Sequence, residues 1–144
     1  MLGDGAKGWI AVYLAQVLAP HWGVAEMGVA LAALAAFLGH LFPVFFGFKG
    51  GKGVATAAGI LLALNLWVGL AVLATWIAVF ALSRISSLSA LTAAASAPLY
   101  AAFFLDKPML ATVIVLSALL IWRHRSNIRN LLLGKEGSFK KAEE

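Results

Sequence analysis

Apolar residues run through most of the chain in long segments that short polar or glycine-rich breaks separate. A bilayer core needs about 20 apolar helical residues, and most of these segments approach that length. We therefore expect an all-α, polytopic integral membrane helix bundle. Its six predicted hydrophobic helices cover residues 5–19, 24–46, 54–64, 66–82, 87–105 and 109–122.

Composition supports a membrane protein and excludes a soluble fold. The 144 residues are 62% hydrophobic and 12% charged, with a mean hydropathy of +0.94. Soluble domains are about half apolar and about one quarter charged.

Cysteine content and net charge narrow the possible chemistry further. The chain has no cysteine, which excludes disulfides, cysteine-based zinc sites and a thiol nucleophile. The formal charge of +5 favours an anionic lipid surface or an anionic substrate. Its scatter between apolar spans argues against nucleic acid as a partner.

The segment 54–82 is long for one helix and short for two full spans. We expect a hairpin of two short helices that turns near Asn65, because this arrangement agrees with the positive-inside rule. It puts only Lys107 on the outer side and ten basic residues on the cytoplasmic side, which are Lys7, Lys49, Lys52, Arg84, Arg123, Arg125, Arg129, Lys135, Lys140 and Lys141. We expect residues 1–134 to form a single transmembrane domain and 135–144 to be a polar cytoplasmic tail.

A glycine-lysine loop, "FKGGKG", interrupts the apolar pattern directly before the predicted helix at 54–64. Glycines let the backbone approach a ligand closely, and successive amides next to a helix N-terminus favour phosphate. The candidate ligands are Lys49, Gly50, Gly51, Lys52 and Gly53, with Thr56 in the first turn of the helix. The spacing does not match a nucleotide-binding Walker loop. The alternative is a flexible cytoplasmic turn whose lysines only set topology.

A second polar cluster, "RHRSNIRN", follows the last predicted span. Arg123, His124 and Asn127 lie three or four residues apart, so we expect them to share a helical face. Arginine, histidine and asparagine side chains can all donate to an oxyanion. The alternative is a basic stop-transfer end that binds lipid headgroups, a role we expect for Arg125 and Arg129.

Other polar residues carry weaker signals. Asp4 and Lys7 open the first span and form either part of a site or a local ion pair at the membrane interface. His40 is interpreted as a packed, hydrogen-bonded core residue rather than a ligand. His21 lies on the opposite side of the predicted bundle and has no partner there. The histidines lie on two faces without an acid pair, so we expect no metal site.

Four sequence stretches together resemble one family. They are Asp4-x-x-Lys7-Gly8, "GHLFPVFFGFKGGKGVAT" at 39–56, "SSL" at 86–88 and "RHRSNIRNLLLGKE" at 123–136. In this order they resemble the bacterial acyl-phosphate:glycerol-3-phosphate acyltransferases, the PlsY family. Members of that family begin with an additional helix and a cytoplasmic motif, so seven helices are expected at full length. We therefore expect this chain to be a truncated form, or one with a misassigned start.

The resemblance implies transfer of a fatty acyl group from acyl phosphate to the sn-1 hydroxyl of glycerol-3-phosphate, which forms lysophosphatidic acid. It also implies a bacterial inner membrane location, an active site facing the cytoplasm, a role in phospholipid biosynthesis and no cofactor. We assign Lys52 and the backbone of Gly50, Gly51 and Gly53 to the acyl phosphate. We expect His124 and Asn127 to orient or bind glycerol-3-phosphate and the developing oxyanion. The remaining candidate binding residues are Lys49, Thr56, Arg123, Asp4 and Lys7.

No protein base is evident, so a substrate phosphate oxygen is the expected proton acceptor. The expected partners are fatty acyl phosphate, glycerol-3-phosphate and membrane lipids.

Two other functions remain open from the residues alone. The first is a small transporter or flippase fragment that binds a phosphorylated solute at the glycine loop. Against it stands the scarcity of charged or polar residues deep in the spans, where His40 and Asn65 are among the few. The second is a structural membrane subunit, which leaves the glycine-lysine loop unexplained.

Overall fold

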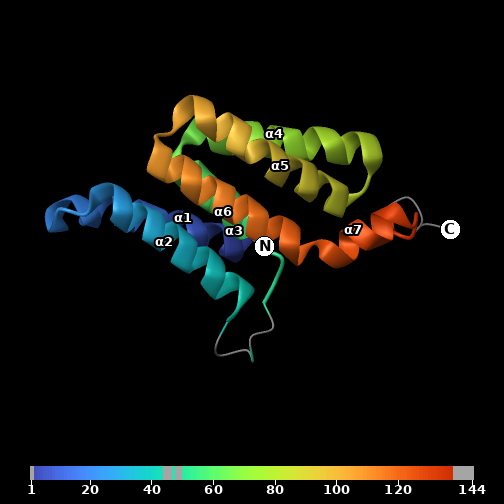
Figure 1. Ribbon diagram of the computed structural model, residues 1–144, viewed down its shortest axis with the longest axis horizontal. Coiled ribbons are helices and arrows are strands. Elements are labelled where there is room, and N and C mark those ends of the chain that lie inside the picture. The colour runs from blue at the N-terminus through green and yellow to red at the C-terminus, as the bar shows by residue number, and fades with distance from the viewer. Residues whose placement is uncertain (1, 44–46, 48–49, 138–144) are drawn as a thin grey trace.

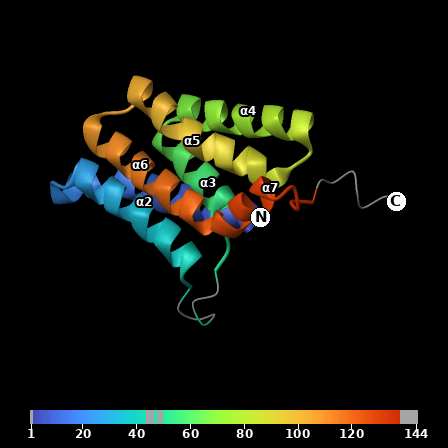
Figure 2. The same cartoon turned by 45° about the vertical axis from the view of Figure 1, so that its right-hand side comes forward.

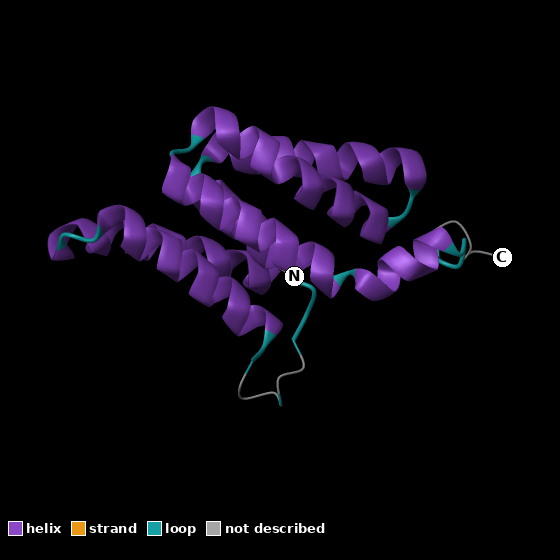
Figure 3. Cartoon of the chain, viewed as in Figure 1, coloured by secondary structure: helices purple, strands orange, loops and turns teal. Residues whose placement is uncertain are grey.

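The computed structural model describes residues 2–43, 47 and 50–137, and these form a helical bundle without strands (Figures 1 and 3). The predicted all-α class is therefore confirmed. The helices are α1 (Leu2–Leu18), the 3-10 helix η1 (Ala19–Trp22), α2 (Ala25–Leu41), α3 (Val54–Leu64), α4 (Leu66–Ser83), α5 (Ser86–Phe104), α6 (Lys107–Arg123) and α7 (Arg125–Leu132).

Each of the six predicted segments corresponds to one helix, and apart from the end of α2 the helix ends lie within three residues of prediction. Two larger differences are found. α2 ends at Leu41 rather than at residue 46. The reason is Pro43, since the residue before a proline is disfavoured in helical conformation, and Phe42 has φ −130° and ψ 63°. Residues 44–46 of the predicted helix lie outside the described residues. The second difference is α7, a short amphipathic helix that bends away from α6 by 58°.

By length and apolarity, α4 and α5 could each cross a membrane, and the bent pair α6 and α7 could form a third crossing. α2 and α3 are apolar but shorter. Large apolar side chains cover much of the outer surface, among them Leu31, Ile77, Leu99 and Phe103. Apolar surface of this extent marks contact with another apolar phase, which for an integral membrane protein is lipid.

The predicted hairpin at 54–82 is confirmed. Asn65 is extended, and its side-chain oxygen accepts from the amides of Trp67 at 2.9 Å and Val68 at 3.2 Å, which starts α4. A Cβ on Gly69 would lie 2.6 Å from Cα of Leu62, so the two arms pack backbone against backbone. At 1.5 Å per residue, the 11 residues of α3 reach about 17 Å and end inside a bilayer core.

α1 and α3 run side by side in the same direction. A Cβ on Gly59 would lie 2.0 Å from the carbonyl oxygen of Gly5, so only glycine allows this approach. Further along, Nε2 of Gln16 donates to the carbonyl oxygen of Ala63 at 3.0 Å. This packing holds the N-terminus of α3 beside the N-terminus of α1.

The helix order separates two ends of the bundle (Figures 1 and 2). The first, called the basic end, holds the starts of α1, α3 and α5, the ends of α2, α4 and α6, and α7. The opposite end holds η1 and the turns at Asn65 and Asp106. Lys7, Lys52 and Arg123 belong to the basic end, whereas Lys107 begins α6 at the opposite end. This grouping agrees with the charge asymmetry expected from the sequence.

Candidate functional site

The described part of the glycine-lysine loop, residues 50–53 and from here on called the glycine loop, turns into α3 at Gly53. This residue precedes α3 with φ +84°, a backbone conformation that L side chains rarely adopt. A Cβ here would also lie 2.5 Å from Cε2 of Phe37, so glycine is required for two reasons. The first-turn amides of α3 lie directly after this turn, with the positive end of the helix dipole.

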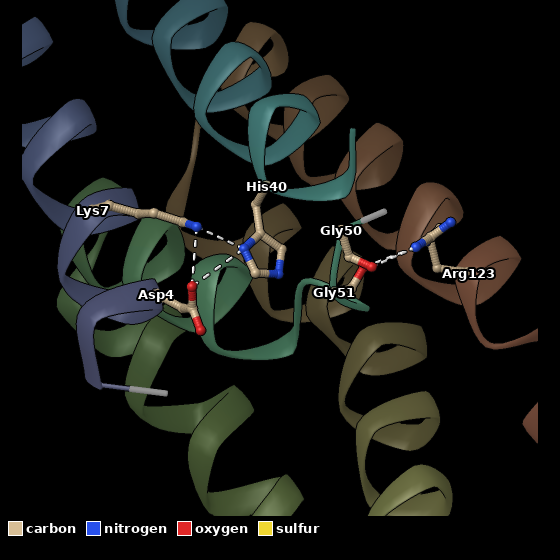
Figure 4. A network of polar contacts seen from close by, with 6 residues as sticks. All are labelled: Asp4, Lys7, His40, Gly50, Gly51 and Arg123. Carbon is tan, nitrogen blue, oxygen red and sulfur yellow. Dashed lines mark hydrogen bonds and ion pairs between the residues drawn. The ribbon is translucent and has the colours of Figure 1, made fainter. Parts of the chain in front are cut away.

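Arg123 binds two backbone carbonyl groups of the glycine loop. Nη2 of Arg123 donates to the carbonyl oxygens of Gly50 at 2.9 Å and Gly51 at 3.2 Å (Figure 4). In a planar trans peptide the carbonyl of one residue and the amide of the next point in opposite directions. The amides of Gly51 and Lys52 therefore point away from Arg123. Arg123 thus orients the loop, a contact that its expected role as a direct phosphate ligand did not anticipate.

A chain of hydrogen bonds joins the loop to α7 and α5. Nζ of Lys52 donates to Oδ1 of Asn127 at 2.6 Å, and Nδ2 of Asn127 donates to Oε1 of Glu136 at 2.6 Å. The hydroxyl of Ser87 donates to the same carboxylate oxygen at 2.5 Å. Glu136 therefore fixes which way the Asn127 amide faces, leaving its carbonyl oxygen for Lys52.

These donors also change the acidity of Glu136. They hold the pKa of its carboxyl below the usual value, with the Ser87 hydroxyl as the largest cause and the Asn127 amide adding to it. Partial burial acts in the opposite direction and is outweighed. Glu136 is thus a carboxylate at neutral pH, which is the form that accepts both hydrogen bonds.

His124 lies at the bend between α6 and α7 and is only 2% exposed. Its Nδ1 lies 2.8 Å from the carbonyl oxygen of Leu120, which can only accept, so Nδ1 carries a proton. In a neutral ring Nε2 is then a proton acceptor. Sequence reasoning placed Arg123, His124 and Asn127 on one face of a continuous helix, and this geometry was wrong. The bend at His124 puts Asn127 in a second helix, where Lys52 holds it.

Asp4, Lys7 and His40 form a third cluster beside the loop (Figure 4). Nζ of Lys7 lies 3.0 Å from Oδ1 of Asp4 and 2.7 Å from Nδ1 of His40. The expected local ion pair between Asp4 and Lys7 is present. Its extension to His40, 33 residues away, connects α1 to the end of α2 next to the loop.

The roles of two expected binding residues, Thr56 and Lys49, stay untested by the contacts. Thr56 is 0% exposed, lies against Gly8 of α1, and its hydroxyl has no hydrogen-bond partner among the described residues. Its contact with a substrate stays a prediction. Lys49 lies outside the described residues. Within the described ranges, no group of three or more His, Cys, Asp or Glu residues could hold a metal ion.

Sequence reasoning missed two residues of this region. Glu136 was assigned to the polar tail, although it is the only acid in the sequence between Asp106 and Lys141. A single acid among many bases is a signal for a specific partner. His40 was interpreted as a core residue, and its position two turns before a phosphate-type loop was the signal available.

An apolar cavity of about 530 Å³ lies between α1, α3, α4, α5 and α6. Its lining includes Trp9, Leu62, Trp76, Ala97, Val113 and Leu120. Gly5 and Val54 also line it, and each is a sequence neighbour of a polar-site residue, Asp4 and Gly53 respectively. The cavity therefore starts at the basic end and runs along the apolar helices.

Comparisons with known proteins show the family and the fold. The sequence model of the family described as glycerol-3-phosphate acyltransferase matches residues 1–134. The chain belongs to the glycerol-3-phosphate acyltransferase family. A relative of that name from Nitrosomonas eutropha is 59% identical over 94% of this chain and 68% of its own length. Another from Ralstonia nicotianae is 60% identical over 94% of this chain and 66% of its own length.

Solved structures of one family member have the same fold. Two crystal structures of PlsY (YgiH), an integral membrane glycerol 3-phosphate acyltransferase, are similar to this chain. The lysophosphatidic acid form has a TM-score of 0.87 at 40% identity, covering 94% of this chain and 68% of that one. The glycerol 3-phosphate form has a TM-score of 0.88 at 39% identity, covering 97% and 69%. The chain thus spans about two thirds of the length of the relatives it matches, and the predicted family resemblance is confirmed.

Proposed function

We propose that the chain carries the acyl-transfer site of a membrane glycerol-3-phosphate acyltransferase in phospholipid biosynthesis. The reaction moves a fatty acyl group from acyl phosphate to the sn-1 hydroxyl of glycerol-3-phosphate. The hydroxyl oxygen bonds to the acyl carbon, the bond from that carbon to the phosphate oxygen breaks, and the hydroxyl proton passes to a phosphate oxygen. The products are lysophosphatidic acid and inorganic phosphate.

The observation that carries this proposal is the junction of two environments. The apolar cavity begins at Gly5 and Val54, next to the cluster that contains Lys52 and the glycine loop. A fatty acyl phosphate has the same two parts, an apolar tail and an anionic head. The cavity would hold the tail, while the head would meet the cations at the basic end.

We assign binding of the phosphate head to the glycine loop. The amides of Gly51 and Lys52 point away from Arg123 and are available to an anion, and the Lys52 ammonium adds a full charge. The hydrogen bond from Lys52 to Asn127 keeps that ammonium at the loop in the absence of substrate. A bound phosphate would replace or share this contact.

His124 and Asn127 are assigned to the second substrate and the developing oxyanion. Nδ2 of Asn127 has two N–H groups and Glu136 accepts from one of them, so the other would donate to an oxyanion while that contact stays. Nε2 of His124 is the acceptor in a neutral ring, which makes His124 a protein candidate for the proton besides a phosphate oxygen. Because acyl phosphate has a good leaving group, electrostatic stabilisation of the charges is the main requirement.

The same site sets the proposed orientation in the membrane. Basic residues gather at one end of the bundle, and the positive-inside rule assigns that end to the cytoplasm. We place the protein in the bacterial inner membrane with the site facing the cytoplasm. Both substrates would then reach the site without crossing the bilayer. Arg125 and Arg129 on α7 would contact lipid headgroups.

The test is a direct assay of the purified protein in detergent or liposomes. Acyl phosphate and labelled glycerol-3-phosphate are supplied, and the expected product is labelled lysophosphatidic acid that depends on both substrates. Vesicles that take up glycerol-3-phosphate without product would support the transporter instead. Absence of both product and glycerol-3-phosphate binding would overturn the proposal for this chain.

A further inference from the structure

The imidazole of His40 lies between Lys7 and the glycine loop. Nδ1 is 2.7 Å from Nζ of Lys7, and Nε2 faces Gly51 so closely that a Cβ there would lie 2.5 Å from it. The His40 side chain is 13% exposed. Nδ1 has a partner, whereas Nε2 makes no hydrogen bond within the described part of the chain.

The contact with Lys7 determines which ring nitrogen carries the proton. A lysine ammonium has three donors and no acceptor, so Nδ1 must accept. The ring is then neutral and its proton sits on Nε2. Oδ1 of Asp4 lies 3.0 Å from the ammonium and 3.4 Å from Nδ1, so Lys7 is the closer partner for both groups. Asp4 thereby keeps Lys7 in place as the donor.

The Nε2 proton is directed at the loop from the side opposite Arg123. Figure 4 draws His40 and Arg123 on opposite sides of Gly50 and Gly51. Arg123 holds the two carbonyl oxygens, so the amides of Gly51 and Lys52 point to the other side. Two backbone donors and one imidazole donor therefore face the same region of the loop.

We propose that His40 is a phosphate-binding residue that donates from Nε2 to the substrate phosphate held in the glycine loop. Lys7 and Asp4 are positioning residues that fix the tautomer of His40 and need not touch the substrate. This proposal rests on the proposed function, because it takes the loop as the phosphate site. A neutral imidazole suits a nearly buried position at the end of α2, since an unpaired charge there would lose its hydration.

The first test observes the ring directly in the unmodified protein. Histidine labelled with ¹⁵N reports the tautomer of each of the three histidines by NMR, and glycerol-3-phosphate or inorganic phosphate is then added. We expect His40 to be neutral with its proton on Nε2, and its Nε2 signal to move on titration with either ligand. A proton on Nδ1, or an Nε2 signal that stays fixed while the amides of Gly51 and Lys52 move, would overturn the inference.

Variants then separate donation from packing. In His40→Asn the shorter amide can still accept from Lys7 but cannot reach the loop, whereas His40→Gln can place an N–H near the position of Nε2. One lost hydrogen bond to a charged group corresponds to at least about a tenfold weaker affinity for phosphate. We expect that loss in His40→Asn and recovery to within about threefold in His40→Gln. Equal affinity in both variants and the unmodified protein would contradict the proposal.

Two controls complete the design. His21→Asn is the matched control, because His21 lies at the opposite end and its one hydrogen bond within the described residues is to the carbonyl oxygen of Val17, at 3.0 Å. Its affinity for phosphate should not change. Lys7→Met removes the donor to Nδ1, so the His40 proton should shift toward Nδ1 and Asp4, a change that a merely structural Lys7 would not cause.

Failure of the inference and failure of the proposed function give different results. If the loop amides respond to phosphate but His40 does not, the loop remains the site and His40 is only structural. If neither responds and no lysophosphatidic acid forms, the proposed function itself fails. Should His40→Asn not fold, the titration of the unmodified protein still decides.

Discussion

The two ends of the bundle use polar side chains in different ways. At the basic end, hydrogen bonds join residues far apart in the sequence: Lys7 to His40, Lys52 to Asn127, Arg123 to the loop and Ser87 to Glu136. Toward the opposite end, one hydrogen bond, from Gln16 to Ala63, joins distant residues, and the others named here stay within a few residues. Asn65 and Asp106 each cap the helix that follows, and His21 contacts the preceding turn.

This difference separates folding from function. A local cap satisfies backbone amides that the helix itself leaves open, and it stabilises the helix wherever it occurs. A contact between distant elements instead fixes the relative position of groups that no single helix could bring together. The basic end has several such contacts around one glycine loop, which is the arrangement expected of a binding site.

The largest effect should come from Lys52→Ala at the basic end. Removal of one donor to the developing charge typically costs on the order of 100- to 1000-fold in rate. The variant should remain folded and extractable, since among the described residues the side chain makes one hydrogen bond, and that bond is exposed. The measurement is the rate of lysophosphatidic acid formation, and an unchanged rate would contradict our assignment of Lys52.

The next largest effect is expected from a glycine substitution at the basic end, compared with a matched one at the opposite end. Gly53→Ala imposes φ +84° on alanine and pushes a Cβ into Phe37, so we expect lower stability and a large loss of phosphate binding. Gly23→Ala is the matched control, with φ +70° but nothing within 4 Å of the new Cβ. It should cost about 1 kcal/mol of stability and leave activity unchanged. Equal loss of activity in both variants would contradict the proposed distinction.

Glu136→Gln tests positioning rather than direct contact. The neutral amide cannot accept from Asn127 and Ser87 as well as the carboxylate does, so we expect a rate loss of about tenfold in lysophosphatidic acid formation.

The same variant tests a pH dependence of stability. The folded-state pKa of Glu136 is lowered, so the contribution of the carboxylate to stability is fully present above the usual pKa near 4.5. That contribution is lost as the pH falls through the lowered pKa. Thermal unfolding of the two proteins should therefore differ at pH 7 and converge in acid; a difference that persisted there would exclude the carboxylate as its cause.

The smallest effect on function should follow Asp106→Ala. Its carboxylate accepts from the amide of Met109 at 3.0 Å, and loss of such a cap costs about 1 kcal/mol. Because the contact is local and at the opposite end, kcat and KM should both stay unchanged. A change in KM for glycerol-3-phosphate would show that the two ends are coupled.

Much of the fold could be predicted from the sequence because apolar segments and their breaks are local signals. The hairpin followed from charge sidedness, and Asn65 sits at its turn as a helix cap. The glycine loop was found from composition. The bend at His124 could not be predicted, because the residues on both sides of it are helical and their sequence pattern does not mark the break. The roles of Arg123, His40 and Glu136 depend on contacts across 73, 33 and 49 residues, which no local pattern contains.

The central claim is that contacts between distant elements, and not local caps, make the site. It can be tested with one pair of matched substitutions, Asn127→Ala at the basic end and Asn65→Ala at the opposite end. Glycerol-3-phosphate is titrated into each purified variant by calorimetry, with thermal unfolding measured in parallel. We predict that Asn127→Ala weakens binding by about tenfold or more, whereas Asn65→Ala costs about 1 kcal/mol of stability with unchanged affinity. Equal affinities in the two variants would contradict the account.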